Sequence, residues 1–514
     1  MSQPVSLIRN ALANSLGVVV AAGIGFFLTP FIIHQVGDSP YGVWALVGAI
    51  AGYTGMLDLG LGFALVKYIA EYRAREEHYK INALVSSTFI SYCILGGLGF
   101  SVLVTISHFA PQWFRLAPEV QGKIVPVFVL SGLALWVALP SSIFSGMLAG
   151  YQRYDLLNTI GIGAAVLNAG LTIVWLSLRA DIVTLAWIGV VITMTRAVLM
   201  GWQAHRLEPN LRIRPELFDS RLLTTAVRYG LGLFVLGFMV QIVWRTDNIV
   251  IGVFLPTYAI TFYTVAFKLN HMYREVVGRM GWVLFPTFSQ LKALQDTGET
   301  RHLLICATRL MLLIAIPMAI VLGTFAEALI MLWMGVEKYT VAAPVLRWLL
   351  IAIFVNLLIT PCSVYLQAVN YLGVCCFIAS TEAIANVIIS VLLVQRLGLI
   401  GVAMGTAIPH ALVAILFVIP YTCYTLQLPV RQFLYAALLP HVLPATLTAG
   451  GAMLLTHVRS EWPFLPLAEA TMVLLGLYLL AYWPLASIHE KQSVKRVVGR
   501  VTECFYRVSL PSQH

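Results

Sequence analysis

The sequence has very little charge for its length. Only 11% of its 514 residues are Asp, Glu, Lys or Arg, whereas 60% are hydrophobic. Soluble globular chains are roughly one quarter charged, and this chain has no polar stretch long enough to form a soluble domain. The composition therefore excludes a water-soluble protein and indicates an integral membrane protein.

Motifs of catalysis and of metal binding are also missing. The seven cysteines form no CxxC pair and the 11 histidines form no HExxH motif, so we predict no metal site. The sequence contains neither a GxxxxGK[ST] loop nor a GxSxG motif. We therefore predict no cofactor, no catalytic residues and no enzyme activity. Without a basic soluble module we expect no nucleic-acid partner.

Long apolar runs dominate the chain instead. About 20 apolar residues in a helix cross the hydrocarbon core of a bilayer. We predict an all-α polytopic membrane protein with about 14 transmembrane helices, at residues 11–33, 41–66, 82–106, 123–147, 157–178, 182–202, 229–254, 258–285, 303–325, 342–366, 374–395, 399–419, 434–456 and 467–487. The tightest connections are predicted after residues 178 and 395.

The distribution of Lys and Arg sets the topology. With the N-terminus in the cytoplasm, 19 of the 32 basic residues fall in cytoplasmic segments and 6 in outer loops, and the other 7 lie within predicted helices. This bias follows the positive-inside rule. We therefore expect both termini to be cytoplasmic.

The longest polar break, residues 203–228, lies near the middle of the chain. Similar short patterns, such as LTP at 28–30 and FLP at 254–256, occur on its two sides. We predict a six-helix bundle at 1–202, a cytoplasmic linker at 203–228, a second bundle at 229–420, two additional transmembrane helices at 434–487 and a basic cytoplasmic tail at 488–514. Bundles with an even number of crossings would be related by a pseudo-two-fold axis along the membrane normal.

Ionisable residues at membrane depth are candidate functional residues, because they are costly in lipid. Gln241, Arg245 and Asn248 follow helical spacing on one predicted helix, and Lys268, His271 and Glu275 follow it on the next. Arg245 and Lys268 lie roughly 15 Å from the outer helix ends at the helical rise of 1.5 Å per residue. Two such stripes predict a wet cavity, and the excess of basic groups suits an anionic passenger.

A purely structural role for these residues stays open. An ion pair between Asp247 and either Arg245 or Lys268 could simply fix helix packing. Asp58, which precedes Gly60 and Gly62, lies in a segment whose glycines favour close helix packing over a binding site.

Several short motifs carry a resemblance to a known family. They are LTPFII at 28–33, YGVW at 41–44, LDLGL at 57–61, KYIA at 67–70 and DNIVIG at 247–252, the last followed by Tyr263. Together they resemble bacterial polysaccharide and O-antigen flippases of the multidrug/oligosaccharidyl-lipid/polysaccharide superfamily. The resemblance implies two six-helix bundles around a central cavity, commonly with two extra helices.

The resemblance also implies a function. Members move undecaprenyl-pyrophosphate-linked sugars across the bacterial inner membrane. The candidate substrate-binding residues are then Arg245, Lys268, Arg274, Gln241, Asn248 and His271, and the candidate ion-coupling or gating residues are Asp58, Asp247, Glu275 and Glu382. The expected partners are the lipid-linked oligosaccharide, membrane lipids, a coupling cation (H⁺ or Na⁺), and a polysaccharide polymerase or glycosyltransferases.

Two alternatives to a flippase are left. A cation-coupled multidrug exporter of the same superfamily would need a cavity dominated by acidic residues. A membrane-embedded glycosyl polymerase or ligase would need a large outer loop or an acid/base array, and the predicted outer loops are short. The surplus of basic residues at membrane depth favours the flippase.

Overall fold

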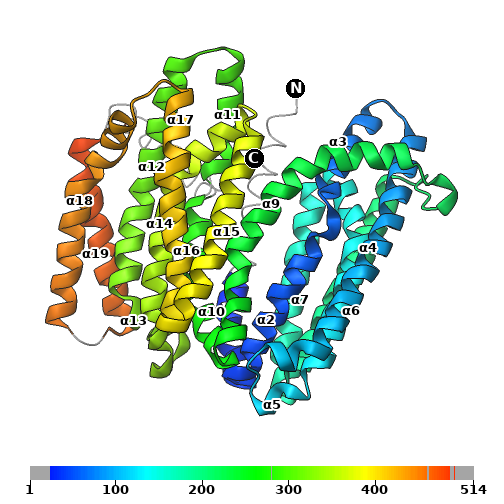
Figure 1. The fold of residues 1–514 in the computed structure, drawn as a ribbon, viewed down its shortest axis with the longest axis horizontal. Coiled ribbons are helices and arrows are strands. Elements are labelled where there is room, and N and C mark those ends of the chain that lie inside the picture. The colour runs from blue at the N-terminus through cyan, green and yellow to red at the C-terminus, as the bar shows by residue number, and fades with distance from the viewer. Residues whose placement is uncertain (1–22, 279, 460–461, 487–490, 492–514) are drawn as a thin grey trace, which may run out of the picture. The chain divides into compact units, whose positions relative to one another are not determined.

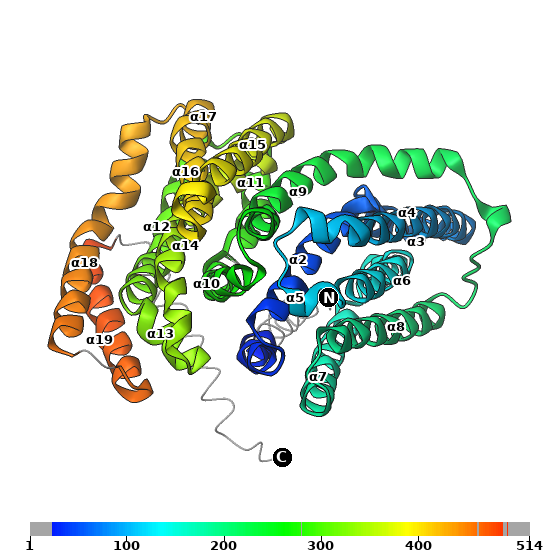
Figure 2. The same cartoon turned by 60° about the horizontal axis from the view of Figure 1, so that its bottom comes forward.

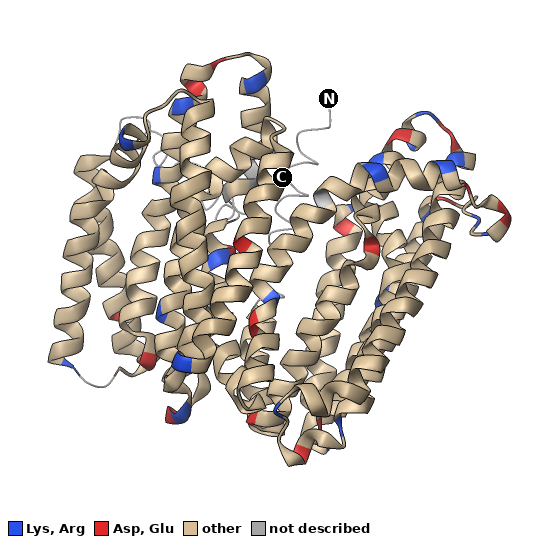
Figure 3. Ribbon diagram, in the orientation of Figure 1, with Lys and Arg blue, Asp and Glu red and all other residues tan. Residues whose placement is uncertain are grey.

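Helices account for all regular secondary structure in the part of the chain that the computed structural model describes, residues 23–278, 280–459, 462–486 and 491. Twelve of these helical segments are long and apolar enough to cross a membrane. Charged residues gather near the helix ends of each unit and are sparse along the helix middles (Figure 3). The predicted all-α polytopic membrane fold is therefore confirmed.

The first half of the chain begins with a described helix at Gly23–Val36. It is followed by α2 (Asp38–Thr54), a 3₁₀ turn (Gly55–Asp58), α3 (Leu61–Ala74), α4 (His78–Trp113), α5 (Pro118–Gln121), α6 (Ile124–Gly150), α7 (Tyr154–Leu178) and α8 (Ile182–Leu207). A second 3₁₀ turn (Pro215–Leu217) precedes the long α9 (Ser220–Phe254).

The second half continues with α10 (Thr257–Gly278), α11 (Met280–Ala293), α12 (Thr297–Thr324), α13 (Ala326–Met334), a 3₁₀ turn (Glu337–Ala342), α14 (Ala343–Ala368), α15 (Leu372–Leu397) and α16 (Leu399–Val413). A π-helical segment η4 (Ala414–Val418), α17 (Ile419–Thr425), α18 (Val430–Val458), α19 (Phe464–Tyr482) and a last 3₁₀ turn (Trp483–Leu485) follow (Figure 1).

The two tightest predicted connections are present, since α7 ends at Leu178 before α8 begins at Ile182, and α15 ends at Leu397 before α16. Twelve predicted spans fall on the twelve membrane-length helices. The other two fall on the helix Gly23–Val36 and on α10 with α11. Residues 11–22, and the tail 488–514 apart from Lys491, lie outside the described residues, and the count of 14 stays a prediction.

The chain divides into two compact units. The first contains residues 1–268 and 379–406, and the second contains residues 269–378 and 407–514, so that α10, α15 and α16 each contribute to both. In the first unit, α6 packs against α4 on one side and α8 on the other (Figure 2), around the buried side chains of Leu84 and Ile143. The predicted bundles at 1–202 and 229–420 remain a prediction.

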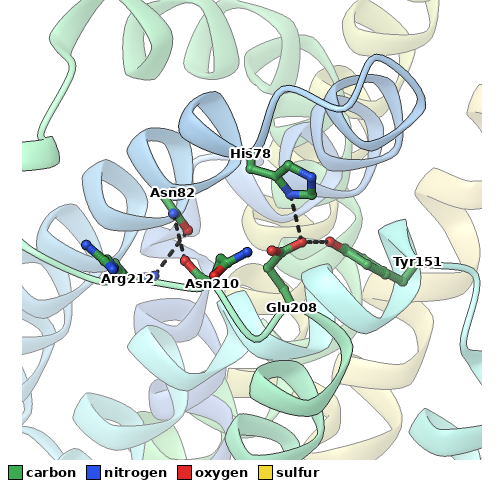
Figure 4. A network of polar contacts seen from close by, with 6 residues as sticks. All are labelled: His78, Asn82, Tyr151, Glu208, Asn210 and Arg212. Carbon is green, nitrogen blue, oxygen red and sulfur yellow. Dashed lines mark hydrogen bonds and ion pairs between the residues drawn. The ribbon is translucent and has the colours of Figure 1, made fainter.

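A clasp of side chains holds the connection between α8 and α9 against α4 (Figure 4). Asn82 Nδ2 donates to the Asn210 carbonyl at 3.0 Å, and Asn82 Oδ1 accepts from the Arg212 amide at 3.1 Å. The buried Glu208 carboxylate accepts from the Tyr151 hydroxyl and lies 3.2 Å from His78 Nδ1. Burial and this carboxylate raise the pKa of Tyr151, so its hydroxyl remains the donor. The clasp satisfies backbone groups that have no helical partner.

In the second unit, α18 and α19 lie side by side and both contact α12 (Figures 1 and 2). His441 of α18 is buried, and its Nδ1 lies 2.8 Å from the Tyr478 hydroxyl of α19. Arg309 of α12 donates from Nε to the Ala436 carbonyl at 2.6 Å. Polar bonds between helices therefore join the two C-terminal helices to the rest of the unit.

Candidate functional site

The predicted stripe on α9 is built around Arg245. Its Nε donates to Gln241 Oε1 at 2.9 Å, one helical turn away. The guanidinium also faces α2, where Nη1 lies 3.5 Å from the Gly48 carbonyl and a Cβ added to Gly52 would lie 2.3 Å from Nη1. Gly52 therefore makes room for the guanidinium. Asn248 lies further along α9 and is half-buried.

Asp247 lies two residues beyond Arg245 but in very different surroundings. Its side chain is buried, with the whole residue only 3% exposed. Oδ2 accepts from the Tyr263 hydroxyl of α10 and from Thr406 Oγ1 of α16 at 3.1 Å. Asn386 of α15 donates from Nδ2 to Thr406 Oγ1 at 3.0 Å. Four helices of the first unit thus meet in what we call the Asp247 cluster, formed by Asp247, Tyr263, Asn386, Ser390 and Thr406.

Three buried oxygens of the cluster lack a hydrogen-bond partner among the residues that the structure describes. They are Asp247 Oδ1, Asn386 Oδ1 and Ser390 Oγ. Leaving such groups unpaired costs about 1–3 kcal/mol each, so their presence calls for an explanation. Carboxylate, amide and hydroxyl oxygens are the ligands that hard cations take, and a carboxylate oxygen can equally take a proton. The cluster therefore has the chemistry of a cation or proton site.

The cluster depends on a close approach of α15 and α16. A Cβ at Gly401 would lie 2.3 Å from the Leu393 carbonyl oxygen, and one at Gly405 would lie 2.1 Å from Ser390 Oγ. Glycines four residues apart on a helix face let two backbones come this close. As a result, Ser390 and Asn386 of α15 lie beside the Gly405–Thr406 turn of α16.

Lys268 is the second basic residue that the sequence singles out in the first unit. Its Nζ donates to Thr29 Oγ1, on the helix Gly23–Val36, and Thr29 is itself fully buried. Neither Lys268 nor Arg245 forms an ion pair with an Asp or Glu in the described part of the chain. The ion pair that would join Asp247 to Arg245 or Lys268 is therefore absent, because Asp247 is bonded to hydroxyl groups instead.

The remaining candidates on α10 belong to the second unit. Arg274 Nη2 lies 3.4 Å from His271 Nε2 and 3.8 Å from Glu275 Oε1. His271 Nε2 lies 3.9 Å from the same carboxylate oxygen. Glu275 is therefore a counter-charge to Arg274, and it leaves this group much less cationic than Arg245 or Lys268.

Asp58 occupies a break between α2 and α3. Its Oδ1 accepts from the Gly60 amide at 3.0 Å, and Leu59 and Gly60 adopt positive φ angles of 52° and 76°. A Cβ at Gly60 would lie 2.4 Å from the Gly230 carbonyl oxygen of α9, so this glycine serves close packing as predicted. Glu382 is half-buried on α15, one turn before Asn386.

A search of the sequence for charged residues at membrane depth finds Asp247 but not the other members of the Asp247 cluster. Asn386, Ser390 and Thr406 are uncharged, and the sequence gives no sign that they approach Asp247. In the sequence, Tyr263 stands out only because it follows the DNIVIG motif at 247–252. The signal that could have found the others is the pair Gly401 and Gly405, which marks a close helix contact beside polar residues.

The chain matches the model of a known protein family. The model of the family described as "Polysaccharide biosynthesis protein" matches residues 7–292. A putative O-antigen transporter of Shigella flexneri is 20% identical over 418 residues, which cover 81% of this chain and 98% of the relative. A probable low-salt glycan biosynthesis flippase of Haloferax volcanii is 21% identical over 420 residues, or 80% of this chain and 82% of the relative.

Solved structures share the fold. An inward-facing MATE family transporter of the MOP superfamily superposes with a TM-score of 0.67 at 14% identity, covering 80% of this chain and 94% of the other. The lipid II flippase MurJ in an inward closed conformation gives 0.66 at 14% identity, covering 95% and 100%. The relatives and these neighbours are named as transporters or flippases, in agreement with the prediction that the chain is not an enzyme.

Proposed function

This chain belongs to the polysaccharide biosynthesis protein family, and from that premise we propose that it is a flippase for polyprenyl-pyrophosphate-linked oligosaccharides. It takes the lipid-linked sugar from the inner leaflet of the bacterial inner membrane and delivers it to the outer leaflet by alternating access. The polyprenyl chain stays in lipid while the polar head group crosses.

The observation that carries this proposal is the unneutralised charge of Arg245 and Lys268. Both lie on predicted transmembrane helices, and neither has an acidic partner among the described residues. Buried cations at membrane depth require an anion or a wet cavity. A guanidinium presents a rigid fork of donors that matches phosphate oxygens, and the hydrogen bond that Arg245 donates to Gln241 fixes its orientation. Arg245 and Lys268 therefore bind the pyrophosphate, with His271, Arg274 and Asn248 as further candidates.

The Asp247 cluster supplies the coupling. A buried carboxylate with one unpaired oxygen is stabilised by a proton or a small cation. Tyr263 and Thr406 donate hydrogen bonds to Oδ2 of Asp247. These bonds fix the orientation of the carboxylate and therefore the position of the unpaired Oδ1. Binding of H⁺ or Na⁺ at Asp247 then favours one of two arrangements of the helices that meet there. Asp58, Glu275 and Glu382 are further candidates for coupling or gating.

Alternating access requires parts that move as bodies. The division of the chain into two compact units supports this mechanism. A multidrug exporter of the same superfamily is the second candidate, and the shared fold with a MATE family transporter favours it. The unneutralised Arg245 and Lys268 count against a cationic drug as the passenger.

The test uses the purified full-length protein in liposomes that contain a polyprenyl-pyrophosphate-linked fluorescent sugar. A glycosidase added outside reports sugar that has crossed. We expect protein-dependent exposure that falls in Arg245→Ala and Lys268→Ala. Arg347→Ala is the matched control, because this arginine is paired with Glu327 at 2.7 Å and is not one of the candidate residues. Full activity of both variants would contradict the assignment, and drug efflux without sugar exposure would favour the exporter.

A further inference from the structure

An open apolar groove of about 540 Å³ lies on the second unit, between the first turns of α15 and the segment η4–α17. Its walls include Gly373 and Phe377 on one side and Leu416, Phe417, Tyr421 and Tyr424 on the other. Its volume falls within the roughly 300–1,000 Å³ of small-ligand sites. None of its lining residues belongs to the Arg245 stripe or the Asp247 cluster, so the groove is independent of the proposed transport site.

The local structure explains why the groove is open. Gly373 has no side chain, and a Cβ added there would meet no atom within 4 Å. On the opposite wall the helix changes to π-helical geometry at Ala414–Val418, a distortion that often marks functional positions. Phe377 and Leu416 are each 60% exposed. In a membrane, such exposed apolar side chains contact lipid chains.

One end of the groove is aromatic and cationic. Tyr371 and Tyr421 make an edge-to-face contact at 5.7 Å, and Tyr424 is 79% exposed. Lys292, in the last turn of α11, places Nζ 5.9 Å from the centre of the Tyr371 ring. Tyrosines beside a lysine are typical of the membrane interface.

A second cation lies at the same end of the unit. Arg301 of α12 donates from Nε to the carbonyl of Leu426, directly after α17, at 2.7 Å. The acidic Asp296 between Lys292 and Arg301 uses its carboxylate to cap α12 by accepting from the Glu299 amide at 2.9 Å. The groove thus runs from a basic, aromatic rim at the helix ends toward the apolar middle of the span.

We propose that this groove binds an anionic phospholipid of the cytoplasmic leaflet. One acyl chain lies against Phe377 and Leu416, and the phosphate lies at the rim near Lys292 and Arg301. The charge at the rim complements an anionic head group, and basic residues attract the anionic lipids of this leaflet. The predicted topology places the rim on the cytoplasmic side.

The test is native mass spectrometry of the purified full-length protein with phosphatidylglycerol and, separately, with phosphatidylcholine. Gly373→Leu places an apolar side chain in the groove from a position where an added Cβ meets no atom within 4 Å, and we expect it to lose one tightly bound phosphatidylglycerol. Gly450→Leu is the matched control on α18, because its added Cβ also meets no atom within 4 Å. Lys292→Ala, an exposed position that should not disturb folding, should weaken phosphatidylglycerol binding about fivefold, the effect of one basic residue at an anionic surface.

Phosphatidylcholine binding should be weaker and unchanged by Lys292→Ala. Equal binding of both lipids, or an unchanged number of bound lipids in Gly373→Leu, would overturn the proposal. Displacement of phosphatidylglycerol from the groove by polyprenyl phosphate would also overturn it, since it would assign the groove to the tail of the transported lipid.

Discussion

Arg245 and Asp247 are only two residues apart on α9, yet their surroundings have little in common. Arg245 is half-buried beside the glycines of α2 and is bonded to Gln241. Asp247 is almost fully buried among residues of α10, α15 and α16. Residues two apart on a helix point in different directions, so opposite charges close in sequence need not form a pair. On the proposed function, one helix would therefore carry the substrate site on one face and the coupling site on another.

The largest effect that would separate the two sites is expected from Asp247→Asn. The amide keeps the size of the side chain but removes the charge that attracts a cation. Gradient-driven accumulation of the lipid-linked sugar should fall at least about tenfold, since even outer-shell partners of a bound metal ion are worth 10–100-fold. Accumulation in proteoliposomes with an imposed Na⁺ or pH gradient measures this. Gradient-driven transport at the wild-type rate would remove Asp247 from the coupling mechanism.

Two glycines of α2 offer a matched test of whether the position of the Arg245 guanidinium matters for substrate binding. Gly52→Ala places a Cβ against the guanidinium, whereas a Cβ at Gly48 would meet no atom within 4 Å. We expect Gly52→Ala to weaken binding of the pyrophosphate lipid about tenfold, the value of a charged hydrogen bond of about 1.5 kcal/mol. Gly48→Ala should bind like the wild type. Binding of a polyprenyl-pyrophosphate analogue gives the comparison, and equal affinities would show that the position of Arg245 is unimportant.

Thr406→Val should destabilise the protein by weakening the hydrogen bonds of the Asp247 cluster, without affecting Arg245. The substitution keeps the shape of the side chain but leaves Oδ2 of Asp247 and Nδ2 of Asn386 with one partner fewer. The expected cost is about 1–3 kcal/mol, seen as a lower melting temperature in detergent. Thr264→Val is the control, because its hydroxyl bonds only to the Ile260 carbonyl of its own helix. Similar melting temperatures for the two variants would show that the hydrogen bonds of Thr406 with Asp247 and Asn386 do not stabilise the protein.

The smallest effect is expected from Gln241→Ala, which removes the side-chain acceptor that orients Arg245. Loss of one hydrogen bond of about 1 kcal/mol predicts roughly fivefold weaker binding of the pyrophosphate analogue. The response to a gradient should stay intact, because Gln241 does not touch the Asp247 cluster. A loss of gradient response in this variant would mean that the two sites are not separate.

The sequence predicts the helices well, and it places two residues of the site on the same helix face. Apolar runs locate the membrane spans, and the spacing of Gln241 and Arg245 places both residues on one face of a helix, where the structure shows a hydrogen bond between them. It also identifies Asp247 as a functional candidate. These inferences rest on local geometry, which the order of residues determines.

The remaining partners could not be predicted because they depend on tertiary packing. Thr406 and Asn386 are uncharged, and they are brought to Asp247 by the close contact of α15 and α16 at Gly401 and Gly405. The alternative in which Asp247 pairs with Arg245 or Lys268 is not found among the described residues, because one oxygen of the carboxylate accepts from the hydroxyls of Tyr263 and Thr406 instead.

The most direct test of the account measures sugar exposure in proteoliposomes with and without an ion gradient, for Arg245→Ala and Asp247→Asn side by side. The account predicts that Arg245→Ala lowers the rate under both conditions but keeps the ratio between them. Asp247→Asn should keep slow exposure without a gradient and lose the acceleration that the gradient gives. If both variants lost rate and gradient response to the same extent, Arg245 and Asp247 would belong to a single site, and the separation of substrate binding from coupling would be wrong.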